Sequence, residues 1–214
     1  RFNPTRIAFI REKIINHFNI VTDERKPFKN IKLIDIGCGG GLLSEPMAKL
    51  GANVTGLDIV EKNIKTASAH AINQGLKINY VHSTIENFCE KDEKFDVILN
   101  MEVIEHVSDV SLFINSCNKI LSPNGIMIFA SLNRTLISYG LAIIGVEYIL
   151  GWLPKGTHDW SKFITPDELK ILFSSNGLKV DEIIGMKYNP FLDNWKRSKD
   201  LSVNYLGVSS KINS

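Results

Sequence analysis

A short apolar run, Lys32-Leu-Ile-Asp-Ile36, leads without a break into the glycine-rich segment Gly37-Cys-Gly-Gly-Gly41. An apolar run of this length predicts a buried strand. Glycine has no Cβ, so the backbone can turn tightly here and a ligand can approach it closely. We also predict a helix at about residues 42–50. The segment therefore indicates a strand, a ligand-binding loop and a helix, in that order.

The same alternation of strands and helices continues along the chain. We predict strands at residues 54–58, 78–81, 95–100 and 126–131, and helices at residues 59–73 and 110–120. Such alternation predicts a parallel sheet that is covered on both faces. These sheets bind ligands at the carboxyl ends of their strands. The candidate residues at those ends are Asp35, Gly37, Asp58, Ser83, Met101 and Glu102.

The two ends of the chain extend this pattern. Asn3-Pro4 suits the start of a helix, with Asn as the N-cap and Pro at the first helical position. The capping box Thr165-Pro-Asp-Glu168 begins another helix, which ends at Asn176-Gly177. Residues 178–187 and 201–209 then predict two strands joined by a polar loop. Because we find no internal repeat and no linker, we predict a single domain over residues 1–214.

The composition argues against several classes of protein. The 214 residues are 44% hydrophobic and 22% charged, as in an ordinary globular domain. A net charge of +2, with Lys and Arg spread along the chain, argues against nucleic-acid binding. The three cysteines, Cys38, Cys89 and Cys117, lack a C-x-x-C spacing, which disfavours a disulfide framework or a zinc site. Because the chain begins at Arg1, we expect its natural N-terminus to be missing, and a cleaved targeting peptide stays open.

The glycine loop and Asp58 together indicate a ligand that contains a nucleoside. Asp58 ends the strand after the loop, where a carboxylate can accept hydrogen bonds from ribose hydroxyls. A dinucleotide-binding unit has both features, but its G-x-G-x-x-G pattern would place the third glycine at Leu42. Asp35, just before the loop, suits a ligand with an ammonium group and would repel a pyrophosphate.

Two levels of resemblance follow from these residues. D-I-G-C-G-G-G at 35–41 resembles the first motif of class I S-adenosylmethionine methyltransferases, and Asp58 resembles their ribose-binding acid. More narrowly, the chain resembles the ubiquinone biosynthesis O-methyltransferases over nearly its whole length. The segments that carry this likeness are N-P-T-R at 3–6, D-I-G-C-G-G-G-L-L-S-E at 35–45, V-T-G-L-D at 54–58, M-E-V-I-E-H-V at 101–107, S-L-N-R-T at 131–135, G-V-E-Y-I-L-G-W-L-P-K-G-T-H-D-W at 145–160, K-Y-N-P at 187–190 and V-N-Y at 203–205.

The resemblance implies a fold and a reaction. The fold is a Rossmann-like α/β domain with a seven-stranded, mostly parallel sheet whose last strand is antiparallel. Helices cover both faces, and a lid is inserted after the fifth strand. The cofactor is S-adenosylmethionine, and the methyl acceptor is a phenolic hydroxyl of a polyprenyl catechol or demethylubiquinol.

The resemblance also assigns cofactor contacts, position by position, to Arg6, Gly37, Asp58 and Met101. From the residues alone, Arg6 is a solvated helix residue and Met101 belongs to the core. Adenine is usually held after the third strand in this superfamily. The full set of predicted cofactor-binding residues is Arg6, Asp35, Gly37, Gly39, Asp58, Ser83, Thr84, Ile85 and Met101.

Glu102, Glu105 and His106 have the i, i+3 and i+4 spacing that places three side chains on one side of a helical turn. A phenol with a pKa of about 10 is mostly protonated at neutral pH, so its methylation needs a general base or a bound cation. In the resembling family this cluster binds a divalent cation, taken to be magnesium, and we carry that expectation onto these residues. On chemistry alone, zinc or manganese fits the mixed set better. Alternatively, His106 is the general base or orients the substrate.

The segment at about 134–164 is the predicted lid insertion. Residues 136–153 are apolar nearly all round, and Arg134, Lys155 and Lys162 flank them. We predict that this lid also makes peripheral contact with an anionic membrane surface, because the family's substrates carry polyprenyl tails. The expected contacts to the substrate head group are Lys155, Thr157, His158 and Asp159.

The resemblance further implies a location. It is the cytoplasmic face of the inner membrane in a bacterium, or the matrix side of the inner membrane in a mitochondrion. A complex with other enzymes of ubiquinone biosynthesis is an additional expectation.

Other functions compete with this one, and the nearest is a class I methyltransferase that acts on another small molecule. An NAD-dependent oxidoreductase shares the fold and Asp58 but gives no role to the Glu–His cluster. Methyltransferases of nucleic-acid bases carry an Asn/Asp-Pro-Pro-aromatic element after the fourth strand, where this chain has Asn100-Met-Glu-Val. A binding protein without catalysis would leave the cluster without a purpose.

Overall fold

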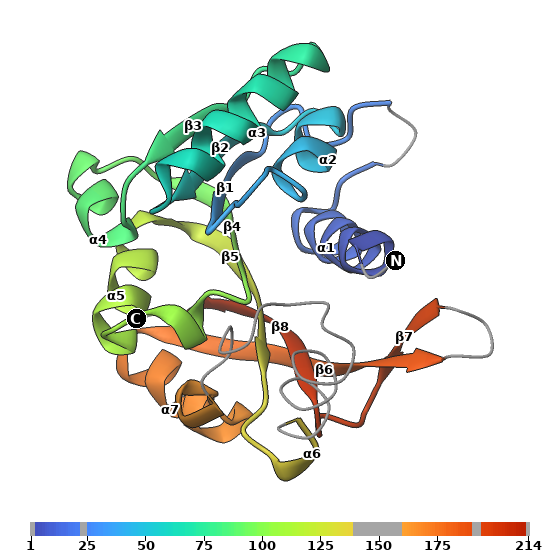
Figure 1. Cartoon of the computed structure of the whole chain (residues 1–214), viewed down its shortest axis with the longest axis vertical. Helices are drawn as coiled ribbons and strands as arrows, with labels where there is room; N and C mark the ends of the chain where they lie inside the picture. The colour runs from blue at the N-terminus through green and yellow to red at the C-terminus, as the bar shows by residue number, and fades with distance from the viewer. Residues whose placement is uncertain (1–2, 22–24, 139–159, 190–193, 213–214) are drawn as a thin grey trace.

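The structure is a computed structural model that describes residues 3–21, 25–138, 160–189 and 194–212 (Figure 1). Its strands are β1 (Lys32–Ile36), β2 (Asn53–Asp58), β3 (Asn79–His82), β4 (Phe95–Met101), β5 (Leu121–Leu132), β6 (Leu178–Asn189), β7 (Asn194–Ser198) and β8 (Asn204–Lys211). Its helices are α1 (Asn3–Phe18), α2 (Ser44–Lys49), α3 (Glu61–Asn73), α4 (Ile85–Phe88), α5 (Val110–Ile120), α6 (Leu136–Ser138) and α7 (Pro166–Ser175). Single 3₁₀ turns lie at Cys89–Lys91, Ile104–His106 and Trp160–Lys162. All the predicted strands and helices are present.

In the described part of the chain, the strands form one eight-stranded sheet with the order β3-β2-β1-β4-β5-β8-β6-β7. The five strands from β3 to β5 in this order are parallel to one another. The last strand, β8, lies antiparallel between β5 and β6. The predicted Rossmann-like α/β fold, with its antiparallel last strand, is therefore confirmed.

The number of strands is a correction, because we expected seven. The predicted polar loop between the last two strands contains β7, which pairs antiparallel with β6 from Gly185↔Ser198 to Asn189↔Asn194. β6 pairs with β8 only as far as Gly185 and then runs on to Asn189. The backbone of this extension needs hydrogen-bond partners, and the returning chain supplies them.

Helices cover both faces of the sheet, and each face has its own apolar core (Figure 1). On one face lie α1, α2 and α3, and Phe9 and Met47 pack there with Leu99 of β4. On the other face lie α4, α5 and α7, and Phe173 packs there with Ile98 of β4. Neighbouring residues of β4 enter different cores because successive side chains of a strand point to opposite faces.

The loop after β1 depends on two glycines, Gly37 with φ +69° and Gly41 with φ +83°. A Cβ at Gly37 would lie 2.5 Å from Cγ2 of Val103, and one at Gly41 would lie 2.3 Å from the hydroxyl of Tyr80. Both the backbone conformation and the close packing therefore require glycine. The N–H of Gly37 donates to the carbonyl of Leu57 at 2.7 Å, which holds the ends of β1 and β2 together.

The predicted insert is described only at its two ends. α6 follows β5, and the 3₁₀ turn at Trp160–Lys162 begins the return. The indole N–H of Trp160 donates to the carbonyl of Thr135 at 3.0 Å and closes the base of the insert. Residues 139–159, which hold most of the predicted lid, lie outside the described residues. In the ranges that the structure describes, no helix is long and apolar enough to cross a membrane.

Candidate active site

A pocket of about 530 Å³ opens where the carboxyl ends of β1, β2 and β4 meet. This is the position at which an open α/β sheet binds its ligands. The predicted residues that line it are Gly37, Asp58, Ser83, Thr84, Ile85, Glu102 and His106. Five other predicted residues have a described position but do not line the pocket: Arg6, Asp35, Gly39, Met101 and Glu105.

Asp58 is held in place by three hydrogen bonds. Its Oδ2 atom accepts from the N–H of Gly39 at 2.9 Å. Its Oδ1 atom accepts from the N–H of Val60 at 2.8 Å and from the side-chain amide of Asn63 at 3.2 Å. The carboxylate is thus oriented at the pocket wall, in the place predicted for a ribose-binding acid. Gly39 contributes through this bond rather than by lining the pocket.

Asp35 lies beneath the glycine loop and is almost fully buried. The hydroxyl of Ser44 donates to its Oδ2 atom at 2.6 Å. Burial raises the pKa of Asp35 to about 6, and the hydrogen bond from Ser44 opposes this shift. Its predicted contact with an ammonium group stays a prediction.

The loop after β3 forms the far wall of the pocket. The N–H of Ser83 donates to the carbonyl of Asp58 at 3.2 Å, and Thr84 caps α4 by accepting from the N–H of Asn87 at 3.3 Å. These contacts place Ser83, Thr84 and Ile85 beside the ribose acid, where we predicted adenine.

Sequence reasoning missed several lining residues, namely Ile59, Val60, Asn63, Val103 and Leu112. Ile59 and Leu112 are large apolar side chains that are 69% and 50% exposed. A bound nucleoside would cover such surface. A usable signal was in the sequence, because Ile59 and Val60 follow Asp58 directly and precede the helix that carries Asn63.

Arg6 of α1 forms an ion pair with Glu102, at the end of β4. The Arg6 side chain is mostly buried, and burial lowers its pKa while Glu102 opposes this shift. Met101 is buried in the core on the α1 side of the sheet. The ion pair therefore ties the N-terminal helix to the edge of the pocket.

Glu102, Glu105 and His106 do not share the single helical turn that their spacing suggested. The helical turn begins only at Ile104, and Glu102 precedes it with a left-handed backbone, φ +61°. Glu105 is buried and accepts from the hydroxyl of Ser131 at 3.0 Å. Its pKa is raised to about 7, chiefly by burial. His106 is exposed and lines the pocket.

The residues present do not fit the metal site that the resemblance implied. A cation would need the carboxylates of Glu102 and Glu105 to converge with His106, but these carboxylates bind Arg6 and Ser131 instead. Within the described ranges, no group of three His, Cys, Asp or Glu side chains is arranged to hold a metal ion. The predicted substrate contacts Lys155, Thr157, His158 and Asp159 lie outside the described residues.

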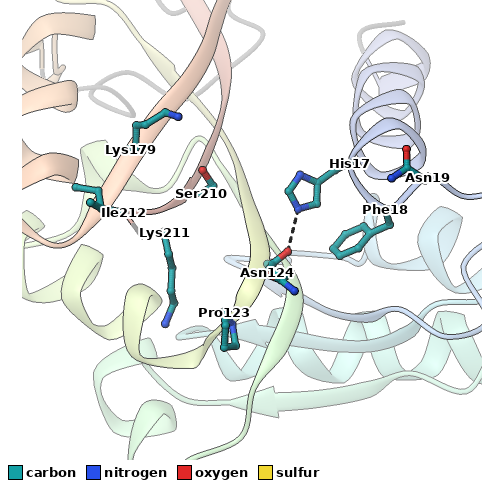
Figure 2. A pocket seen from close by; sticks show the side chains of 10 residues that line it. His17, Phe18, Asn19, Pro123, Asn124, Lys179, Ser210, Lys211 and Ile212 are labelled. Atoms are coloured by element: carbon teal, nitrogen blue, oxygen red, sulfur yellow. Dashed lines mark hydrogen bonds between the residues drawn. The ribbon is translucent and has the colours of Figure 1, made fainter. Parts of the chain in front are cut away.

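A second cavity, of about 620 Å³, lies at the opposite edge of the sheet. Figure 2 shows His17 of α1 facing Asn124 at the start of β5, and Nε2 of His17 lies 2.8 Å from the Asn124 carbonyl oxygen. None of the predicted site residues lines this cavity.

Comparison with known proteins defines the class. A methyltransferase domain family matches residues 34–129. Magnesium protoporphyrin IX methyltransferase from Synechocystis PCC 6803, solved with bound SAH, aligns with a TM-score of 0.67 at 19% identity, over 97% of this chain and 83% of that one. An S-adenosylmethionine-dependent methyltransferase from Clostridium acetobutylicum aligns with a TM-score of 0.69 at 15% identity, over 97% and 91% of the two chains. The fold is that of a class I S-adenosylmethionine-dependent methyltransferase.

Relatives with much higher identity narrow the assignment. The ubiquinone biosynthesis O-methyltransferase of Bartonella tribocorum is 57% identical over 99% of this chain and 85% of that protein. The protein of the same name from Parvibaculum lavamentivorans is 51% identical over 99% of this chain and 83% of its own length. The chain belongs to the ubiquinone biosynthesis O-methyltransferase family, and it is an S-adenosylmethionine-dependent O-methyltransferase.

Proposed function

We propose that this enzyme methylates a phenolic hydroxyl of polyprenyl catechol and demethylubiquinol intermediates in ubiquinone biosynthesis. The names of relatives that are 51% to 57% identical support the substrate class. The observation that carries the proposal is that one pocket is lined by both Asp58, whose carboxylate is held in place by hydrogen bonds, and His106. We assign Asp58 to the ribose hydroxyls and His106 to the base.

The chemistry requires one proton transfer. A bond forms between the phenol oxygen and the methyl carbon, and the bond from that carbon to the sulfonium sulfur breaks. The phenolic proton must leave, and we assign it to the imidazole of His106. Magnesium at these residues is implied by the resemblance alone, and because the carboxylates do not fit such a site, the proposed step does without a metal.

We also propose that the insert at about 134–164 covers the pocket and contacts an anionic membrane surface. In this arrangement Lys155, Thr157, His158 and Asp159 would face the substrate head group. Support comes from the described start of the insert, where Leu136 is 81% exposed. Arg134, which we had expected to meet lipid head groups, instead forms an ion pair with Glu168 of α7. Its charge is therefore compensated within the protein.

The proposed location follows from the substrate. A lipid-tailed quinol is found in the bilayer, so the enzyme would work at the cytoplasmic face of a bacterial inner membrane or at the matrix side of a mitochondrial one. Other enzymes of ubiquinone biosynthesis would be its neighbours there.

The test is methyl transfer from S-adenosylmethionine to two soluble acceptors, a short-chain demethylubiquinol and a short-chain prenyl catechol, followed by mass spectrometry. Both should gain one O-methyl group, and Asp58→Ala should remove the activity. Transfer to neither phenol would favour another small-molecule acceptor. Loss of turnover in chelated buffer, with recovery on adding a divalent cation, would contradict the metal-free proton transfer.

A further inference from the structure

The β6–β7 hairpin extends beyond the strands that form the pocket. Residues that are paired across neighbouring strands lie at the same height along the strand direction. One such row, which we use as a reference level, consists of Ile36, Asn100, Phe129, Gly207 and Ile183. Because β6 runs parallel to β1, its later residues lie beyond the carboxyl edge at which the pocket opens. Asn189 is six residues past this level, or about 20 Å at roughly 3.3 Å per residue. Figure 1 shows β6 and β7 continuing past β8.

One face of the hairpin is fixed to α1. Arg197 of β7 forms an ion pair with Glu12 at 2.8 Å, and the hydroxyl of Thr5 donates to the carbonyl of Trp195 at 3.4 Å. Met186, directly across from Arg197, is buried in the core beneath α1. Since side chains alternate along a strand, Lys187 and Lys196 lie on the opposite face.

Lys187 and Lys196 form an unusual cross-strand pair. They are directly opposite each other in the antiparallel register, and both are exposed. Like charges in this position destabilise a sheet. Among the described residues neither lysine forms an ion pair, and the nearby Asp200 is influenced by Lys187 but already accepts from the N–H of Ser202. A third exposed lysine, Lys199, follows β7.

An aromatic pair lies one residue nearer the tip. The rings of Tyr188 and Trp195 are 5.4 Å apart, and Tyr188 is 40% exposed. By the same alternation these rings lie on the α1 face, where Trp195 packs against the core and helps to fix the hairpin to the domain. On the other face, Lys187 and Lys196 present two positive charges side by side, and an anionic lipid surface would supply counter-charge to both.

We infer that the β6–β7 hairpin is a membrane contact of its own, in which Lys187 and Lys196 bind the head groups of anionic phospholipids. This inference rests on the proposed function, because the substrate tail brings the enzyme to the bilayer. The hairpin projects from the same edge as the pocket, so docking through it turns the pocket mouth toward the lipid.

The experiment is co-sedimentation with phosphatidylcholine vesicles that contain about a third phosphatidylglycerol. Lys187→Gln/Lys196→Gln should weaken partition by roughly thirtyfold, the value for two lysines that each contribute about 1 kcal/mol at an anionic surface. The matched control is Lys62→Gln/Lys77→Gln, which removes two exposed lysines on and just after α3 and so gives the same net charge. The control should bind like the parent, and Lys187→Arg/Lys196→Arg should retain binding.

Two outcomes would overturn the inference. One is equal partition of the parent and the Lys187→Gln/Lys196→Gln variant, including a parent that does not bind vesicles. The other is the same loss in both double glutamine variants, which would reduce the effect to net charge. Methyl transfer to a soluble short-chain phenol should be unchanged in every lysine variant, and its absence in the parent would count against the proposed function instead.

Discussion

The carboxylate of Asp58 accepts a hydrogen bond from the backbone N–H of Gly39 at 2.9 Å, which joins the end of β2 to the glycine loop. These two elements must lie at a fixed separation for one nucleoside to contact both. Because Asp58 has further bonds from Val60 and Asn63, its orientation is set before any ligand arrives.

Replacing Asp58 should therefore remove much of the cofactor affinity. In Asp58→Ala the ribose hydroxyls face no acceptor, and the N–H groups of Gly39 and Val60 lose theirs. We expect S-adenosylmethionine to bind at least tenfold more weakly by calorimetry. Unchanged affinity would contradict the assignment of the pocket to this cofactor.

Asn63 should support Asp58 from the first turn of α3. Asn63→Leu removes the 3.2 Å hydrogen bond while keeping a similar volume. A hydrogen bond contributes about 1 kcal/mol net, and the carboxylate keeps its two backbone donors, so cofactor affinity should fall by roughly threefold to tenfold with little change in kcat. Asn73→Leu, at the exposed end of the same helix, is the control and should have no effect.

Arg6 should recognise the carboxylate of the cofactor, since that is the anionic group of S-adenosylmethionine. Arg6→Ala should weaken binding of S-adenosylmethionine about tenfold or more, because hydrogen bonds between charged groups are the stronger ones. Binding of decarboxylated S-adenosylmethionine should not change. Arg11→Ala, an exposed arginine on the same helix, is the control. Equal losses for both ligands would assign Arg6 to holding Glu102 only.

Glu105 should make stability fall as the pH rises. Its pKa is raised from 4.5 to about 7 in the folded protein, so the unfolded chain releases this proton at a lower pH. Ionisation of Glu105 therefore opposes folding progressively between about pH 4.5 and pH 7. Relative to the parent, Glu105→Gln should gain about 2–3 kcal/mol of unfolding free energy between pH 5 and pH 7.5. Urea unfolding at the two pH values measures this, and a constant difference would contradict a buried, titrating carboxyl.

His106 should be needed for turnover and not for cofactor binding. His106→Asn keeps a polar side chain without a comparable base, so kcat should fall by roughly 10² to 10⁴ while the Kd for S-adenosylmethionine stays constant. His17→Asn, at the far edge of the sheet, should keep parent activity. A fully active His106→Asn enzyme would assign the proton transfer to another group.

Local patterns in the sequence were enough for the order of the main strands and helices, the glycine loop and the position of Asp58 at the end of β2. The capping box is an example, because Thr165 accepts from the N–H of Glu168 at 3.3 Å and its own N–H donates to the Glu168 side chain at 2.9 Å, as predicted. Such features depend on residues a few positions apart, and periodicity, glycines and caps record them directly.

The arrangement around Glu102, Glu105 and His106 was decided only by tertiary structure. Ser131 of β5 draws Glu105 into the interior, and Arg6 of α1 holds Glu102 across the edge of the sheet. Spacing along the chain predicted one shared face, because it assumes a regular helical turn. The packing of distant strands and helices instead imposes a left-handed backbone at Glu102 and gives Glu102 and Glu105 different partners. That competition between local geometry and long-range contacts cannot be read from any single segment.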